Sequence, residues 1–282
     1  MNLAFLVFFV FGSTTCPGQQ KDAFEPVHWA YSSLFGTGWY QIKDARSVFV
    51  LRLPPRQTVR RASISESGER KWGVEIKYPL TIGLHDVEDI GGIIDNDNFG
   101  TVSFVPGVEL EFPVNQRWYL RPFAHIGWGK ELELGESAWI YNIGIKSHYS
   151  FPSKTKNTWF LLNGLRYAGY SPDEGRSDVL AVAELGVEFN QPLNTATLMG
   201  RPLDLHWNLM YSFFGKELHF NLPDGSFDPI QDQIELGLQM SFRDGPYKLW
   251  FLNIHRLGLG YRFSTSGQFS AITFSMRSWF TN

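Results

Sequence analysis

Trp72-Gly-Val-Glu-Ile-Lys-Tyr-Pro-Leu-Thr-Ile-Gly-Leu84 has a large apolar residue at every second position. Because side chains alternate between the two faces of a β-strand, this stretch predicts a ribbon with one apolar face and one polar or small face. Its apolar face carries Trp72, Val74, Ile76, Tyr78, Leu80, Ile82 and Leu84. At about thirteen residues the ribbon is longer than a typical soluble strand and suits a tilted crossing of a bilayer. We therefore expect an all-β fold, a transmembrane antiparallel β-barrel.

The same two-faced pattern recurs to the end of the chain. The other expected strands are 38–43, 47–58, 102–112, 118–128, 139–149, 158–171, 179–189, 203–213, 230–244, 248–264 and 269–280. A change of parity predicts a bulge near Asn253 to Arg256. Single-chain bacterial barrels have even strand numbers, so the pattern favours about twelve strands.

The lengths of the connections predict which end of the barrel faces the periplasm. With the last strand running downward, the short connections Asn115–Gln116, Ser153–Asn157 and Asp244–Tyr247 become periplasmic turns. Val87–Asn98 and Glu217–Pro229 become extracellular loops. Two further connections on the periplasmic side, Arg60–Lys71 and Leu193–Arg201, are long for such turns.

The composition agrees with a membrane barrel. The chain has 282 residues, of which 43% are hydrophobic, 16% aromatic and only 19% charged, whereas soluble domains carry about 25% charged residues. Beyond the first residues no apolar run reaches the roughly eighteen that a transmembrane helix needs. The net charge of −3 comes without a basic cluster, which argues against nucleic acid as a partner.

The N-terminal region divides into two expected segments. Residues 1–20 resemble a signal peptide, with an apolar core over 2–12 and small residues around Cys16, the single cysteine. Lipidation of Cys16 is an alternative, although Ser13-Thr-Thr is a poor match to a lipobox. Residues 21–36 contain a Pro near the start and a Gly at the end of a short helical segment, so they are expected either to plug the lumen or to form a periplasmic tail. Residues 37–282 form the barrel.

The inward face of the expected strands is strongly charged. We expect these lumen-lining residues to pair across neighbouring strands in a hydrated interior, or to form the charge ring of a conducting pore. They are Glu75, Lys77, Glu109, Glu111, Arg121, His125, Lys146, His148, Arg166, Glu184, Glu188, Asp204, His206, Glu235, Arg243, Arg256, Arg262 and Arg277.

No catalytic, metal or cofactor site is expected. The seven histidines are scattered, and no Gly-x-Ser-x-Gly or His-Glu-x-x-His motif is present. The adjacent pairs His85-Asp86 and Ser147-His148 point to opposite faces of a strand, so neither pair can act directly as nucleophile and base. A lipid hydrolase at the barrel rim, using His85 and Asp86, is the alternative to a structural or pore-like role. A surface adhesin or receptor acting through the loops Val87–Asn98 and Glu217–Pro229 is another.

From about residue 35 onward the chain resembles the autotransporter-type outer-membrane β-barrels of Gram-negative bacteria. The resemblance rests on Val105-Pro-Gly-Val-Glu-Leu-Glu-Phe-Pro113, on Trp118-Tyr-Leu-Arg-Pro-Phe-Ala-His-Ile-Gly-Trp128, and on Leu257-Gly-Leu-Gly-Tyr-Arg-Phe263. It implies a barrel of about twelve strands with an N-terminal helix in the lumen, located in the outer membrane. Fewer than about 35 residues precede the barrel, so we expect no secreted passenger. The expected partners are outer-membrane lipid and the barrel-assembly machinery, and the expected state is a monomer.

Overall fold

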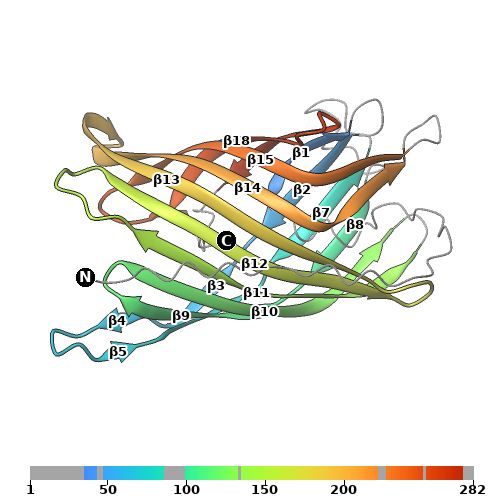
Figure 1. Ribbon diagram of the computed structural model, residues 1–282, viewed down its shortest axis with the longest axis horizontal. Helices are drawn as coiled ribbons and strands as arrows, with labels where there is room; N and C mark the ends of the chain where they lie inside the picture. Colours follow the sequence, from blue (N-terminus) through green and yellow to red (C-terminus); the bar gives the residue numbers. More distant parts are fainter. Residues whose placement is uncertain are drawn as a thin grey trace.

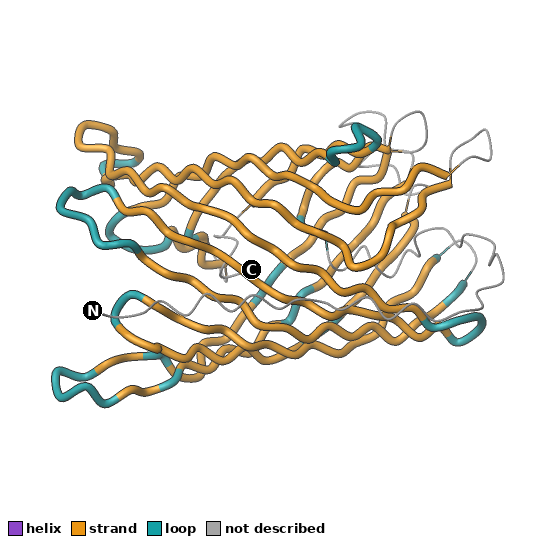
Figure 2. Tube along the Cα trace, in the orientation of Figure 1, coloured by secondary structure: helices purple, strands orange, loops and turns teal. Residues whose placement is uncertain are grey.

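The structure, a computed structural model, describes residues 35–42, 47–85, 99–132, 135–221, 227–249 and 252–275. Within these residues the secondary structure consists of strands joined by turns (Figure 2). The strands are β1 Thr37–Ile42, β2 Ser47–Leu53, β3 Arg56–Arg60, β4 Ser63–Ile64, β5 Arg70–Lys71, β6 Gly73–Lys77, β7 Leu80–His85, β8 Phe99–Phe104, β9 Gly107–Asn115, β10 Trp118–Glu131, β11 Ser137–Ser150, β12 Thr158–Pro172, β13 Asp178–Leu198, β14 Arg201–Asn221, β15 Phe227–Phe242, β16 Tyr247–Leu249, β17 Leu252–Ile254, β18 Arg256–Phe263 and β19 Phe269–Ser275.

Fifteen of these elements form one sheet that closes on itself, as expected for a barrel (Figure 1). The order around the sheet runs from β11 through β15, β18, β19, β1, β2, β7 and β8 to β10, and a β10–β11 pairing closes the ring. The element pairs β2/β3, β6/β7 and β8/β9 are each two halves of one crossing, so the barrel has twelve strands. The predicted fold class and strand number are confirmed.

Prolines divide those three crossings at neighbouring places in the wall. Pro55 lies between β2 and β3, Pro79 between β6 and β7, and Pro106 between β8 and β9. Proline cannot donate to a sheet ladder, so each interrupts its strand. The wall stays continuous because the three proline carbonyls accept backbone hydrogen bonds from the next crossing, at 2.9 Å from Tyr78, 3.2 Å from Val105 and 3.0 Å from Ile126.

At Gly127, strand β10 approaches closely the backbone between β8 and β9. A Cβ atom at Gly127 would lie 2.0 Å from the carbonyl oxygen of Phe104, so only glycine fits without a backbone shift. This close approach gives a physical reason for the glycine inside the Trp118–Trp128 motif.

The connections differ from the sequence prediction in three places. Leu193–Arg201 is not a long connection, because β13 and β14 extend to a two-residue turn at Met199-Gly200. Both turn residues have positive φ, 55° and 74°, as in the hairpin turns that match strand twist. Arg60–Lys71 is partly a β4–β5 hairpin, and strand structure occupies most of Glu217–Pro229. Residues 87–98 lie outside the described part.

The expected strand 248–264 is divided in the structure. Residues 247–249 form β16, which pairs with β17, and β18 then continues the barrel wall beside β15. The break between β17 and β18 falls at His255, where the sequence predicted a bulge. We call the barrel end with the Gln116-Arg117 and Met199-Gly200 turns the turn end, and the opposite end the loop end.

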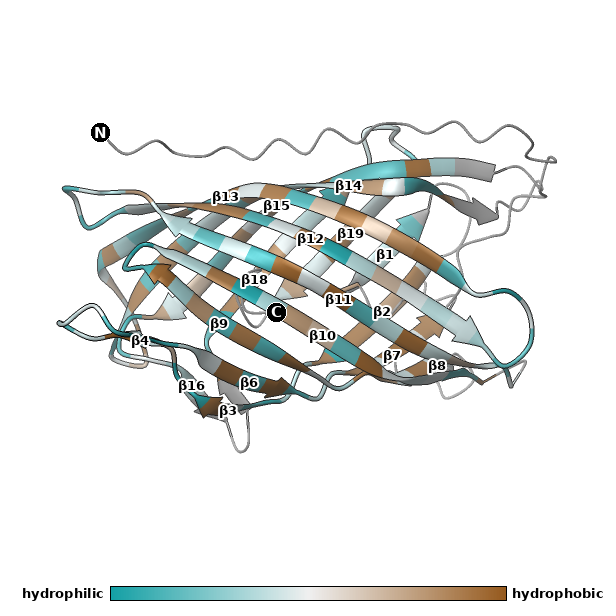
Figure 3. Ribbon diagram, turned by 60° about the horizontal axis from the view of Figure 1, so that its bottom comes forward, coloured by the Kyte–Doolittle hydropathy of each residue, from teal (hydrophilic) through white to brown (hydrophobic). Residues whose placement is uncertain are grey.

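Apolar and polar residues alternate along many of the wall strands (Figure 3), and large apolar side chains are exposed on the outer face of the wall. Exposed side chains there include Ile126 at 62%, Leu185 at 56% and Ile143 at 55%. Trp128 and Trp139 pair across β10 and β11 near the loop end, while Trp72 and Trp118 lie near the turn end, as expected for interfacial aromatic belts. None of the described segments is a helix long and apolar enough to cross a membrane.

Leu84 departs from the alternation predicted for its strand. It is only 3% exposed although Trp72, of the same parity, is 49% exposed. The register between β7 and β8 shifts between Gly83 and Leu84, where Gly83 faces Thr101 and Leu84 faces Phe99. An irregularity of this kind breaks the strict period of two, which explains the one departure from alternation between Trp72 and Leu84.

Leu185→Arg should destabilise the barrel by about 2–4 kcal/mol, the cost of a charge on the lipid-facing wall near the bilayer midplane. Leu185 is exposed on β13, between the paired strands β12 and β14. Equilibrium unfolding in urea, after refolding into phospholipid vesicles, measures the change. The control is Gln191→Arg, an exposed position closer to the turn end of the same strand. Equal stability of the two variants would show that Leu185 does not face lipid.

Candidate functional site

The charged residues expected in the lumen lie on the face of the wall opposite the exposed apolar side chains. Those with ion pairs between described residues are Glu75, Lys77, Glu109, Glu111, Arg121, Lys146, Arg166, Glu184, Glu188, Asp204, His206, Glu235, Arg243, Arg256 and Arg262. Arg277 lies outside the described residues. The interior therefore brings most of these groups together as cross-strand pairs.

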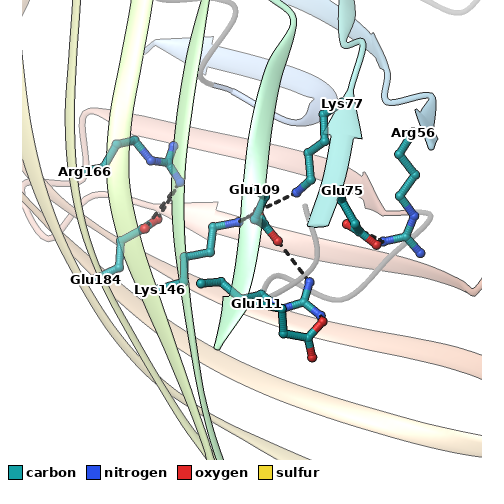
Figure 4. A network of polar contacts seen from close by, with 9 residues as sticks. Arg56, Glu75, Lys77, Glu109, Glu111, Lys146, Arg166 and Glu184 are labelled. Atoms are coloured by element: carbon teal, nitrogen blue, oxygen red, sulfur yellow. Dashed lines mark hydrogen bonds and ion pairs between the residues drawn. The ribbon is translucent and has the colours of Figure 1, made fainter. Parts of the chain in front are cut away.

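Glu109 on β9 is the centre of the largest group of ion pairs among the described residues (Figure 4). One of its carboxylate oxygens accepts a hydrogen bond from Lys77 Nζ at 2.6 Å, and the other accepts one from Arg121 at 3.0 Å. Lys146 Nζ lies 4.0 Å away. Glu109 is 2% exposed, and Lys77, Arg121 and Lys146 are also buried. A buried carboxylate shared by several cations is stable only while these partners remain.

Neighbouring carboxylates complete the Glu109 group. Glu75 on β6 stands directly opposite Glu109 in the sheet, a repulsive placement for two like charges. Arg56 offsets it by contacting Glu75 at 3.1 Å, and Arg121 reaches Glu111 at 2.7 Å. Arginine side chains placed between the carboxylates thus offset their repulsion and connect them by ion pairs.

Glu188 on β13 is the centre of a second group. It is 3% exposed and lies 2.8 Å from Arg256 Nη1 and 3.4 Å from His206 Nδ1. His206 Nε2 lies 2.8 Å from Ser241 Oγ. Each partner comes from a different strand, so this group also ties neighbouring crossings together.

Two further predicted histidines are held by other contacts. His125 Nδ1 lies 3.3 Å from the carbonyl oxygen of Val105. The His148 ring stacks on Phe160, with a centroid distance of 4.6 Å and an interplanar angle of 19°. These contacts, one to a backbone carbonyl and one to an aromatic ring, are not those of a histidine that activates a nucleophilic hydroxyl.

A small interior cavity of about 80 Å³ lies between charged and apolar side chains. Its charged lining consists of Arg52, Arg166, Arg262, Glu184 and Glu235. Arg166 pairs with Glu184 at 3.3 Å, and Arg262 pairs with Glu235 at 2.5 Å. The first described residues of the chain, Phe35 and Gly36, also line this cavity.

The interior also contains an apolar cluster that the sequence analysis missed. Its members are each 8% exposed or less, and Phe35 and Val48 pack against them. The cluster joins Tyr40 on β1 to Tyr170 on β12, which are six steps apart around a ring of twelve strands. It comprises Tyr40, Val50, Val105, Ala138, Ile140, Tyr170, Leu180, Val182, Phe214, Leu218, Ile230, Phe269 and Ala271.

A signal for this cluster was present in the sequence. Where a strand is buried on one face and lipid-exposed on the other, both faces are apolar and the alternation disappears. Val179-Leu-Ala-Val-Ala183 and Phe213-Phe214 show this loss, as does Ser47-Val-Phe-Val-Leu51. Arg52 follows the last of these stretches on the inner face and was also missed.

The residues expected for rim chemistry are not placed together by the described part of the chain. His85 ends β7 and pairs through its backbone with Val48, while Asp86 lies outside the described residues. The predicted adhesin loop 87–98 lies outside them as well. Within the described ranges no group of three or more His, Cys, Asp or Glu residues could hold a metal ion.

At the turn end, Arg201 closes the connection between β15 and β16. Its guanidinium donates to both Asp244 oxygens, at 2.6 to 3.0 Å, and lies over the Phe242 ring at 4.3 Å. The hydrogen bonds from Arg201 lower the pKa of the Asp244 carboxyl. This contribution is present above the pKa of Asp244 in the unfolded chain and is lost as the pH falls through the lowered value.

Comparisons with known proteins agree with this geometry. No protein-family model and no curated protein sequence matches the chain. Among solved structures, the chain is similar to the β domain of the Bordetella autotransporter BrkA, with a TM-score of 0.54 and 12% sequence identity. The match covers 84% of this chain and 92% of that one. At this identity the likeness concerns the fold, and the chain has the twelve-stranded barrel fold of an autotransporter β domain.

Proposed function

We propose that the protein is an integral β-barrel of the bacterial outer membrane with a closed interior and a structural role. Its apolar outer wall and aromatic belts support a position across the membrane. The pairings of β1 with β19 and of β10 with β11 close the twelve-stranded sheet, so neither place leaves an unpaired strand edge. Outer-membrane lipid and the barrel-assembly machinery are its proposed partners, and it acts as a monomer without a cofactor.

The apolar cluster is the observation that favours a closed barrel over a conducting pore. A water-filled pore needs a polar lining along its whole length. Here Ile140 and Val50 are 2% exposed on the inner face, and Tyr170 is 4% exposed. We infer that these buried side chains on the inner face leave no continuous aqueous path for an ion.

The contacts of Phe35 and Gly36 support a lumenal place for residues 21–36. The Phe35 ring lies 5.3 Å from the Tyr40 ring, and the Tyr40 hydroxyl donates to the Gly36 carbonyl at 2.8 Å. The described chain thus enters β1 from the inside of the barrel. We propose that residues 21–36 fill the lumen below this point and that residues 1–20 are a signal peptide.

Recordings in planar lipid bilayers test the closed-barrel role. The purified full chain should insert without stepwise conductance, because the apolar cluster blocks ion passage. Insertion is checked separately by flotation with vesicles and by heat-modifiable mobility on gels. Regular conductance steps from correctly folded protein would contradict the proposal and favour a pore.

A further inference from the structure

Arg52 is an interior cation for which the described residues provide no ion-pair partner. Its Nε atom is buried and has no hydrogen-bond partner, and the same is true of Arg166 Nε. The hydrogen bonds at Thr37 involve only the backbone of Arg52, at 3.0 Å, so they fix the strand and not the guanidinium. Among the described residues, no ion pair is made by the Arg52 side chain.

The cavity beside Arg52 has an excess of positive charge. It is lined by three guanidinium groups and two carboxylates. Both carboxylates are already engaged, Glu184 by Arg166 and Glu235 by Arg262. Among the described lining groups one positive charge is left over, in a place with restricted access to water. An uncompensated buried charge is costly, so such a site favours an anion.

We propose that this cavity binds one carboxylate group between Arg52 and Arg166. Arginine presents planar N–H donors that match the two oxygens of a carboxylate. A cavity of about 80 Å³ is larger than one water needs and accommodates a small oxyanion with its remaining hydration. The apolar side that includes Leu180 and Phe214 excludes bulkier anions.

The carboxylate has two sources. One is a free small anion that enters the lumen. The other is Asp22 or Glu25, because the segment 22–36 carries these two acids and no Lys or Arg. The second source rests on the proposed lumenal position of residues 21–36, whereas the first does not.

Thermal unfolding of the full chain in detergent, followed by circular dichroism, distinguishes the sources. Sodium formate is titrated at constant ionic strength against gluconate, an anion too large for the cavity. With a free anion as the natural occupant, formate should raise the midpoint of the native protein by about 3 °C. With Asp22 or Glu25 as the occupant, the native protein should not respond, and a variant with Asp22→Asn and Glu25→Gln should respond instead.

In both cases Arg52→Gln, added to whichever protein responds, should abolish the response to formate. Arg56→Gln is the matched control, since Arg56 pairs with Glu75 and does not line the cavity. If Arg52→Gln fails to fold, Arg52→Lys is tested in its place. This variant keeps the charge and should give a weaker response. The proposal is overturned if neither the native protein nor the Asp22/Glu25 variant responds, or if the response persists after Arg52→Gln is added to the protein that shows it. Bilayer conductance tests the closed barrel separately, so the two failures are distinguishable.

Discussion

Glu109→Gln should lower the free energy of unfolding by about 3–5 kcal/mol, the cost of breaking a buried ion pair from one side. The substitution preserves the size of the side chain but removes the charge that Lys77, Arg121 and Lys146 share. These three cations then repel one another across β6, β10 and β11 in a region with little access to water.

Urea unfolding of vesicle-inserted protein, followed by tryptophan fluorescence, measures this loss. Glu174→Gln is the control, because Glu174 is exposed in the connection between β12 and β13 and should change stability by less than about 0.5 kcal/mol. A second variant, Lys77→Met with Glu109→Gln, removes one charge of each sign and should recover part of the loss. A single Glu109→Gln variant as stable as the native protein would refute a central role for this network.

Replacing Tyr40, Tyr170 and Phe214 by alanine should make the barrel conduct ions. These rings come from β1, β12 and β14 and belong to the same buried cluster, so we expect their removal to open space in the interior. The expected readout is the appearance of stepwise conductance in planar bilayers where the native protein gives none. Each truncation also removes buried apolar contacts at a cost of about 3–5 kcal/mol, so folding is verified first by heat-modifiable mobility.

A triple variant on the outer face of the same strands provides the control. Trp39 on β1, Tyr167 on β12 and Phe213 on β14 lie on the opposite parity, and Tyr167 and Phe213 are 46% and 41% exposed. Replacing these three residues by alanine removes a similar amount of aromatic surface but leaves the interior filled. Conductance from both triple variants would point to general destabilisation, and silence from both would locate the barrier elsewhere.

The barrel itself could be predicted from local pattern. Alternation in β10 places Ala124, Ile126 and Trp128 on one face of the strand and Arg121 and Gly127 on the other. In a long strand a period of two assigns each residue to one of the two faces. The short β1, expected over 38–43, was found at Thr37–Ile42 for the same reason. The turns were less predictable. Met199, for example, adopts a positive φ, which is uncommon for a residue other than glycine, so its residue type did not indicate a tight turn.

The sequence by itself determined the two faces of the wall, the number of crossings and the charge of the inner positions, because each of these depends on residues close together in the chain. Only the tertiary structure decided which charges meet and which apolar side chains are buried together on the inner face. Arg52 and Arg166 line one cavity, and Tyr40 and Tyr170 join one cluster, although more than 100 residues separate the partners in each pair. Closure of the sheet sets such distances, and no local periodicity encodes how far side chains reach across the ring.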